Sequence, residues 1–165
     1  MKSMNEHIVE YTLQLQKGDI QKAYKDIMLF MAGLKKHMEK RHAGYKTSAV
    51  YPGYMDMTYF AFTPAELRDK NLKIAIVYLH EENRFEAWLG GVNRSIQGKY
   101  IEIFKGKNIG RSKLSKAAPG VDSILELELI EKPDFDDPYK TMILIEKKTM
   151  DFSKDIISFL NMQGV

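Results

Sequence analysis

The stretch from Arg84 to Arg94 contains the residue types best suited to binding chemistry in this chain. Alternation along a strand places Arg84, Glu86 and Trp88 on one face, while Asn93 and Arg94 enter a helix. Free N–H groups at a helix start, a guanidinium and an indole plane together suit an anion. The alternative is that Trp88 packs in the core and Arg84 pairs with Glu86 or with an acid on a neighbouring strand.

A strongly basic stretch follows at once. Residues 94–116 hold seven lysines and arginines against one acid, a balance of +6, whereas residues 122–138 hold seven acids against one lysine. The basic part contains glycines and can hold a phosphate or a nucleic-acid backbone, so Lys107 and Arg111 join Trp88, Asn93 and Arg94 as candidate ligand-binding residues. Two alternatives are that the loop is only solvated, or that opposite blocks pair between two copies in a homodimer.

Two further segments match the residue pattern of an enzyme motif but lack the helices and strands that the motif needs around it. The glycines of residues 106–112 resemble a phosphate-binding loop, yet a helix precedes them where that motif needs a strand. Pro133-Asp134 followed by Glu146-Lys147-Lys148 matches a metal-dependent nuclease signature, but the pattern places Glu146 and Lys148 within a helix. No Gly-x-Ser-x-Gly sequence supplies a hydrolase nucleophile.

The sequence contains no obvious set of metal ligands. The chain has no cysteine, and its four histidines lack the spacing of a zinc site, so the sequence predicts no metal and no cofactor. His37 and His42, five residues apart on one helix, are not expected to share a face. We expect solvent-exposed histidines near helix ends.

The elements that position these residues indicate an α+β class. Apolar residues at steps of three and four predict long helices over 19–42 and 137–162. A three-stranded antiparallel meander is predicted over 54–89, a helix after Asn93, a loop over 106–120, and a strand over 123–130. With a short first helix the order is α-α-β-β-β-α-β-α, a four-stranded, mainly antiparallel sheet packed against the long N- and C-terminal helices.

Composition limits the class of protein. A chain of 165 residues, 44% apolar and 28% charged, is predicted to be one folded domain over residues 1–165. The net charge of +3 is too small to mark the whole chain as a nucleic-acid binder, although nucleic acid stays an alternative partner beside an anionic small molecule or a protein. Neither a signal peptide nor an apolar run of membrane-spanning length is found, so we expect no membrane association and a cytoplasmic location.

The order of elements resembles the core of the restriction-endonuclease-like fold. In that fold the metal-binding acids come from the second and third strands, and the third predicted strand here carries Glu86. A nuclease of this kind would use Asp56, Glu86 and nearby groups with a divalent ion. Trp88 stands where the family's motif has its lysine, so the resemblance implies a divergent or inactive nuclease as the alternative function.

A second resemblance covers nearly the whole chain. The segments 54–60, 73–81 and 84–89, with Asn93-Arg94, are similar to a domain-of-unknown-function family of small bacterial proteins. This resemblance implies a bacterial, cytoplasmic protein with one α+β domain. It brings no activity and no site residues, so whether the chain is an enzyme stays open. The sequence favours a binding or accessory module for an anionic ligand or partner.

Overall fold

Two helices open the chain and meet at a single glycine. The computed structural model describes residues 1–165, and its first helix, α1 (Met4–Lys17), begins with a capping box in which Ser3 Oγ accepts from the Glu6 N–H and the Ser3 N–H donates to the Glu6 carboxylate. Gly18 has a φ of 84°, a left-handed conformation that favours glycine and ends the helix. The next helix, α2 (Asp19–Arg41), begins at the following residue.

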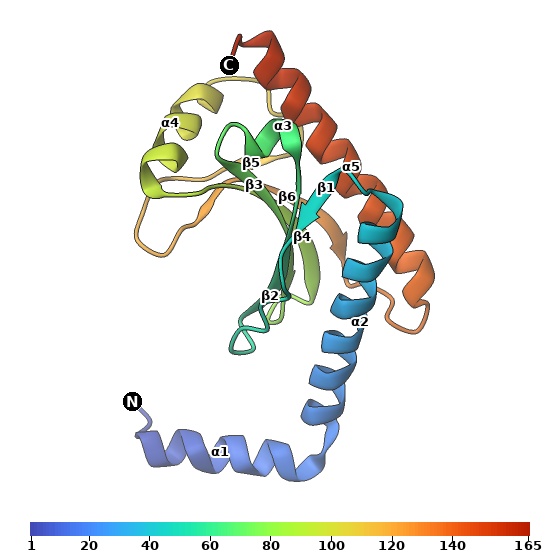
Figure 1. Cartoon of the computed structure of the whole chain (residues 1–165). Helices are drawn as coiled ribbons and strands as arrows, with labels where there is room; N and C mark the ends of the chain where they lie inside the picture. The colour runs from blue at the N-terminus through green and yellow to red at the C-terminus, as the bar shows by residue number, and fades with distance from the viewer.

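A six-stranded antiparallel sheet forms the centre of the protein (Figure 1). In sheet order the strands are β1 (Tyr45–Thr47), β2 (Met57–Pro64), β3 (Leu72–Leu79), β4 (Arg84–Gly91), β6 (Ser123–Glu131) and β5 (Lys113–Leu114). The remaining helices are α3 (Ala65–Arg68), α4 (Arg94–Phe104) and α5 (Pro138–Met162).

The hydrophobic core lies between one face of the sheet and the helices α2 and α5, which run along that side in Figure 1. Register places Phe60, Ile76 and Ala87 opposite one another across β2, β3 and β4, and all three are fully buried. Each long helix adds one apolar stripe at helical spacing: Phe30, Met31, Leu34 and Met38 from α2, and Ile145, Phe152, Ile156 and Leu160 from α5. Burial of these side chains stabilises the fold at roughly 25 cal/mol per Å².

The opposite face of the sheet is not covered by α2 or α5. Its middle row holds Ala61, Ala75 and Trp88 in register, and the adjoining row holds Tyr59, Val77 and Glu86. Several of these side chains are only half-buried. This open face is therefore the surface of the sheet on which side chains remain accessible.

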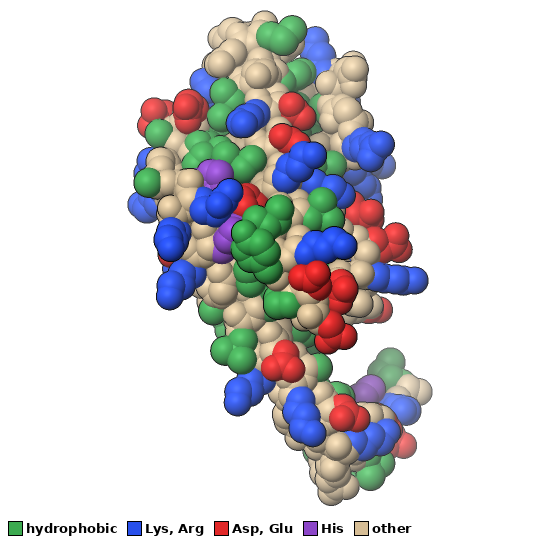
Figure 2. Space-filling view, turned by 90° about the vertical axis from the view of Figure 1, so that its right-hand side faces the viewer, with side chains coloured by type: hydrophobic (Ala, Val, Ile, Leu, Met, Phe, Trp, Pro, Cys, Tyr) green, Lys and Arg blue, Asp and Glu red, His purple; other side chains and the backbone are tan.

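The N-terminal part of the chain projects away from the core. None of residues 1–29 is buried, although α1 carries large apolar side chains that are more than half exposed, among them Ile8, Val9 and Tyr11. Figure 1 shows α1 running away from the N-terminal end of α2, and Figure 2 shows this segment projecting below the rest of the molecule.

Removal of residues 1–17 should leave the core intact, because α1 contributes no buried side chain. We expect the thermal midpoint (Tm) of the shortened chain to lie within about 2 °C of that of the full chain, since a shift of 1 kcal/mol moves Tm by about 2–4 °C at this size. Circular dichroism melts of both chains measure this. A fall of about 10 °C would mean that α1 packs on the core in solution.

The structure confirms the α+β class but corrects the strand count and the order of elements. The sheet has six strands, because β1 and β5, three and two residues long, are too short to show alternation in the sequence. One of them, β5, lies inside the predicted loop 106–120, and the helical turn α3 adds a further element.

The boundaries of the longer elements differ less. The predicted helices 19–42 and 137–162 are observed as α2 and α5 with nearly the same ends. The first predicted strand begins at Met57 rather than residue 54, since Gly53 and Met55 both adopt positive φ before it. None of the helices is both long and apolar enough to cross a membrane.

Candidate functional site

A cavity of about 350 Å³ opens on the uncovered face of the sheet, where the strands meet the start of α4. We call it the sheet-face cavity. Strands β2, β3 and β4 provide its floor, and the first turn of α4 and the residues before β6 provide its rim. The lining side chains with aromatic, charged or amide groups are Tyr59, Lys73, Trp88, Asn93, Arg94, Gln97 and Asp122.

Trp88 is held in place by a carboxylate on its own strand. Its indole Nε1 donates to Glu86 Oε2 at 2.6 Å, and Arg84 donates to Glu86 Oε1 through Nε at 2.9 Å. Glu86 is only 5% exposed, so this acid is saturated by its two neighbours. Of the alternative stated from the sequence, one half is correct, because Arg84 pairs with Glu86. The other half is wrong, because Trp88 lines the cavity and is not part of the buried core.

Arg94 is anchored at the rim by several partners. Its guanidinium donates to Gln97 Oε1 at 2.9 Å and to the carbonyl oxygen of Val121, and it lies 3.3 Å from the Asp122 carboxylate. Asn93 caps the same helix by accepting from the Ile96 N–H at 2.9 Å. These contacts fix the start of α4 against the residues before β6, and they hold the cationic group of Arg94 at the cavity.

The remaining charge of the cavity comes from Lys73. This side chain is exposed and makes no ion pair, whereas Arg94 and Asp122 partly compensate each other. The lining of the cavity therefore has two cations and one carboxylate. Burial raises the pKa of Tyr59, and the nearby Tyr51 and Asp122 raise it further, so the Tyr59 hydroxyl stays protonated and can donate a hydrogen bond.

The structure brings together three of the five residues that the sequence nominated. Trp88, Asn93 and Arg94 line the sheet-face cavity, but Lys107 and Arg111 do not. Arg111 lines a different cavity, and Lys107 is exposed in the loop after α4. The separation arises because α4 carries the chain away from the cavity before the basic loop begins.

Sequence reasoning missed Tyr59, Lys73 and Gln97 as members of this site. A usable signal existed for Lys73, which is the one charged residue within β3, a strand otherwise apolar on both faces. Gln97 is 3% exposed and donates to the carbonyl oxygens of Val121 and Ser123 at 2.8 and 3.1 Å. Its role is to tie α4 to the segment before β6.

The acids of the nuclease alternative have other roles in this structure. Asp56 is exposed in the turn before β2 and accepts from the Tyr54 N–H at 2.8 Å, while Glu86 is occupied as described. Glu146 and Lys148 lie in α5 as predicted, and Lys148 Nζ donates to the Leu129 carbonyl oxygen at 2.7 Å. Nowhere do three or more histidine and acidic side chains come together in a geometry suited to a metal ion.

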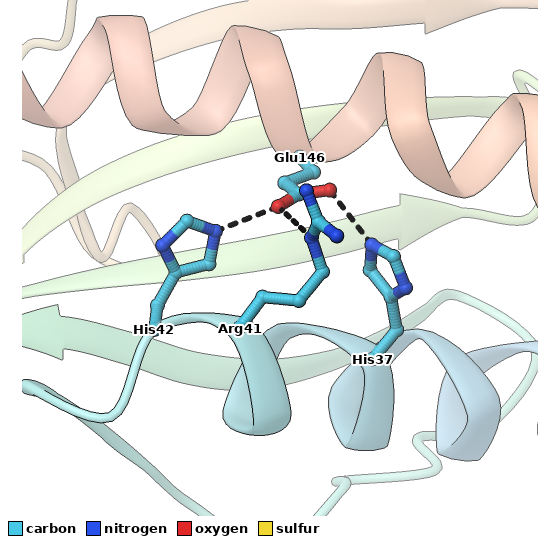
Figure 3. Close-up of polar contacts among 4 residues, drawn as sticks. All are labelled: His37, Arg41, His42 and Glu146. Carbon is cyan, nitrogen blue, oxygen red and sulfur yellow. Dashed lines mark hydrogen bonds and ion pairs between the residues drawn. The ribbon is translucent and has the colours of Figure 1, made fainter.

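A second polar cluster joins the two long helices (Figure 3). The Glu146 carboxylate on α5 accepts from His37 Nε2, Arg41 Nε and His42 Nε2, each at 2.7 Å. Burial by itself raises the pKa of Glu146, but the hydrogen bonds from Arg41, His37 and His42 outweigh it and lower the pKa to about 2. The cluster therefore holds an ionised carboxylate between α2 and α5.

The expectation of exposed histidines is wrong for His37 and His42. Their side chains are 14% and 20% exposed, and both reach the same carboxylate. They can do so because His42 is the C-cap of α2, with φ −134° and ψ 68°, so that its side chain leaves the helical spacing. His80 is also partly buried and lies 2.8 Å from Thr58 Oγ1.

These observations define an α+β protein with one open sheet face and a cavity of small-molecule size on that face. The chain belongs to the family described as "Domain of unknown function (DUF7000)", whose model matches residues 4–160. No curated protein and no solved structure matches the chain.

Proposed function

We propose that this protein is a binding module that holds a small anionic ligand with an aromatic part in the sheet-face cavity. The observation that carries the proposal is that Trp88, Lys73 and Arg94 line the same cavity. An indole supplies a surface for stacking, and two cations against one carboxylate favour a negatively charged group. The proposal assigns binding and no reaction.

The size of the cavity supports a ligand of modest dimensions. A volume of about 350 Å³ lies at the lower end of the range typical of small-molecule sites, roughly 300–1,000 Å³. The Tyr59 hydroxyl and the exposed Lys73 ammonium add hydrogen-bond donors to the Arg94 guanidinium. Donors dominate this set, and such a set suits a phosphate or a carboxylate better than a neutral or cationic group.

The chain contains its own reporter, because Trp88 is its only tryptophan. A titration with adenosine monophosphate should change the Trp88 fluorescence in a saturable way. Adenosine lacks the phosphate and so measures the contribution of the anionic group. Inorganic phosphate lacks the base and so measures the contribution of the aromatic part. We expect each to bind at least about 10-fold more weakly than the nucleotide, since 1.4 kcal/mol of lost interaction corresponds to a factor of ten.

Substitution of Lys73 by Gln should weaken nucleotide binding by about 5- to 10-fold, because it removes the unpaired cation of the cavity lining. Lys154→Gln is a matched control, since Lys154 is exposed on α5 and does not line the cavity. If Lys73→Gln and Lys154→Gln have the same effect, Lys73 has no part in binding. If millimolar nucleotide changes neither Trp88 fluorescence nor Tm, the proposed function is wrong.

A further inference from the structure

A second cavity, of about 440 Å³, lies between the basic loop, β6 and α5. We call it the loop cavity. It shares no residue with the sheet-face cavity. Its walls include Phe104, Leu127, Phe152 and Phe159, and the Phe104 and Phe159 rings stack with their centroids 4.8 Å apart. The walls are therefore suited to an apolar group.

Arg111 is the one cationic side chain that lines the loop cavity. Arg111 is exposed there and makes no ion pair, and residues 105–116 contain five lysines and arginines and no acid. Asp155 on α5 is the single acid of the lining. Apolar walls beside an unpaired guanidinium are complementary to a molecule with an apolar chain and an anionic head group.

From this arrangement we infer that the loop cavity binds an alkyl carboxylate, with the chain against Phe104 and Phe159 and the head group beside Arg111. This site is independent of the sheet-face cavity, and its occupant differs from the aromatic anion proposed there. Arg111, which does not line the sheet-face cavity, thereby gains a role in a second site.

A series of straight-chain carboxylates from hexanoate to decanoate, each kept below micelle formation, tests the inference by calorimetry on the full chain. Each added methylene should tighten binding by about 3- to 4-fold until the cavity is full, because burial of one CH₂ is worth about 0.8 kcal/mol. Trp88 fluorescence should stay unchanged, and adenosine monophosphate should not compete. These two readouts separate failure of this inference from failure of the proposed function.

Charge variants test the head-group position. Arg111→Gln should weaken decanoate binding by about 10-fold and leave decanol binding nearly unchanged, whereas Asp155→Asn should tighten decanoate binding. Lys107→Gln is the matched control from the same loop, since Lys107 does not line the cavity. Equal effects of Arg111→Gln and Lys107→Gln would overturn the assignment of the head group to Arg111.

A variant that fills the loop cavity tests whether the alkyl chain of the ligand lies there. Ile109 is a half-buried loop residue of the lining, so Ile109→Trp should keep the fold and abolish decanoate binding. A circular dichroism melt establishes that the variant is folded. The inference is overturned if the affinity of the unmodified protein for the carboxylates does not depend on the length of their alkyl chain. It is also overturned by a concentration-dependent dimer that Ile109→Trp dissociates, because the cavity would then be covered by a second copy.

Discussion

Replacement of Glu146 by Gln should lower Tm by about 5–10 °C at pH 7, the larger of the two effects argued here. The substitution preserves volume but removes the negative charge that accepts from His37, Arg41 and His42. Loss of a buried charged partner costs about 3–5 kcal/mol, and the half-exposed Arg41 reduces this to roughly 2–3 kcal/mol. At about 2–4 °C per kcal/mol, that loss gives the stated fall in Tm.

The pH dependence of this effect has a definite sign. The pKa of Glu146 falls from an ordinary 4.5 to about 2 on folding, so the stabilisation is fully present above pH 4.5 and is lost as the pH falls toward 2. The difference in unfolding free energy between the unmodified chain and Glu146→Gln should therefore reach its full value above pH 4.5 and become small near pH 2. Urea titrations at several pH values measure it. Glu128→Gln, at an exposed position on β6, is the control and should show no such trend.

The second large effect is expected at Gly91, at the end of β4. A Cβ atom there would lie 2.8 Å from the backbone N of Gln97 and 2.9 Å from Ile96 Cγ2, closer than such contacts allow. Gly91→Ala must push the first turn of α4 away from the sheet. We expect a loss of about 2 kcal/mol or more in the free energy of unfolding, as for other overpacked sites.

Gly98→Ala provides a matched control on the same helix. A Cβ atom at Gly98 meets nothing within 4 Å, and alanine within a helix is favoured over glycine by roughly 0.5–1 kcal/mol. The two substitutions should thus have opposite signs in a denaturant titration. Gly91→Ala should also weaken ligand binding in the sheet-face cavity, because Arg94 moves with the helix. Equal stability of the two variants would contradict the close packing of α4 on β4.

The long helices could be predicted because each carries its apolar stripe within its own sequence. Phe30, Leu34 and Met38 recur at four-residue steps in α2, and this local pattern survives without knowledge of the rest of the fold. The short strand β5 has no such pattern, because two residues cannot alternate. Its position follows from pairing with β6, a contact that the local sequence does not encode.

The difference between local patterns and contacts made only in the folded chain also explains which residues of the candidate site could be predicted. Trp88, Asn93 and Arg94 could be nominated together because they are neighbours in the sequence. Tyr59 and Lys73 enter the sheet-face cavity through the register of three strands, which only the folded sheet determines. Glu146 is an extreme case, since its partners lie between 104 and 109 residues away along the chain.

The single glycine between the first two helices determines the outline of the whole molecule. Only Gly18 departs from helical geometry between Met4 and Arg41. With helical dihedral angles at Gly18, α1 and α2 would form one continuous rod of 38 residues, roughly 57 Å long at 1.5 Å per residue. No buried contact holds α1 against the core, so its amide protons are expected to exchange through local opening rather than global unfolding. The reach and direction of α1 are therefore governed by one backbone hinge.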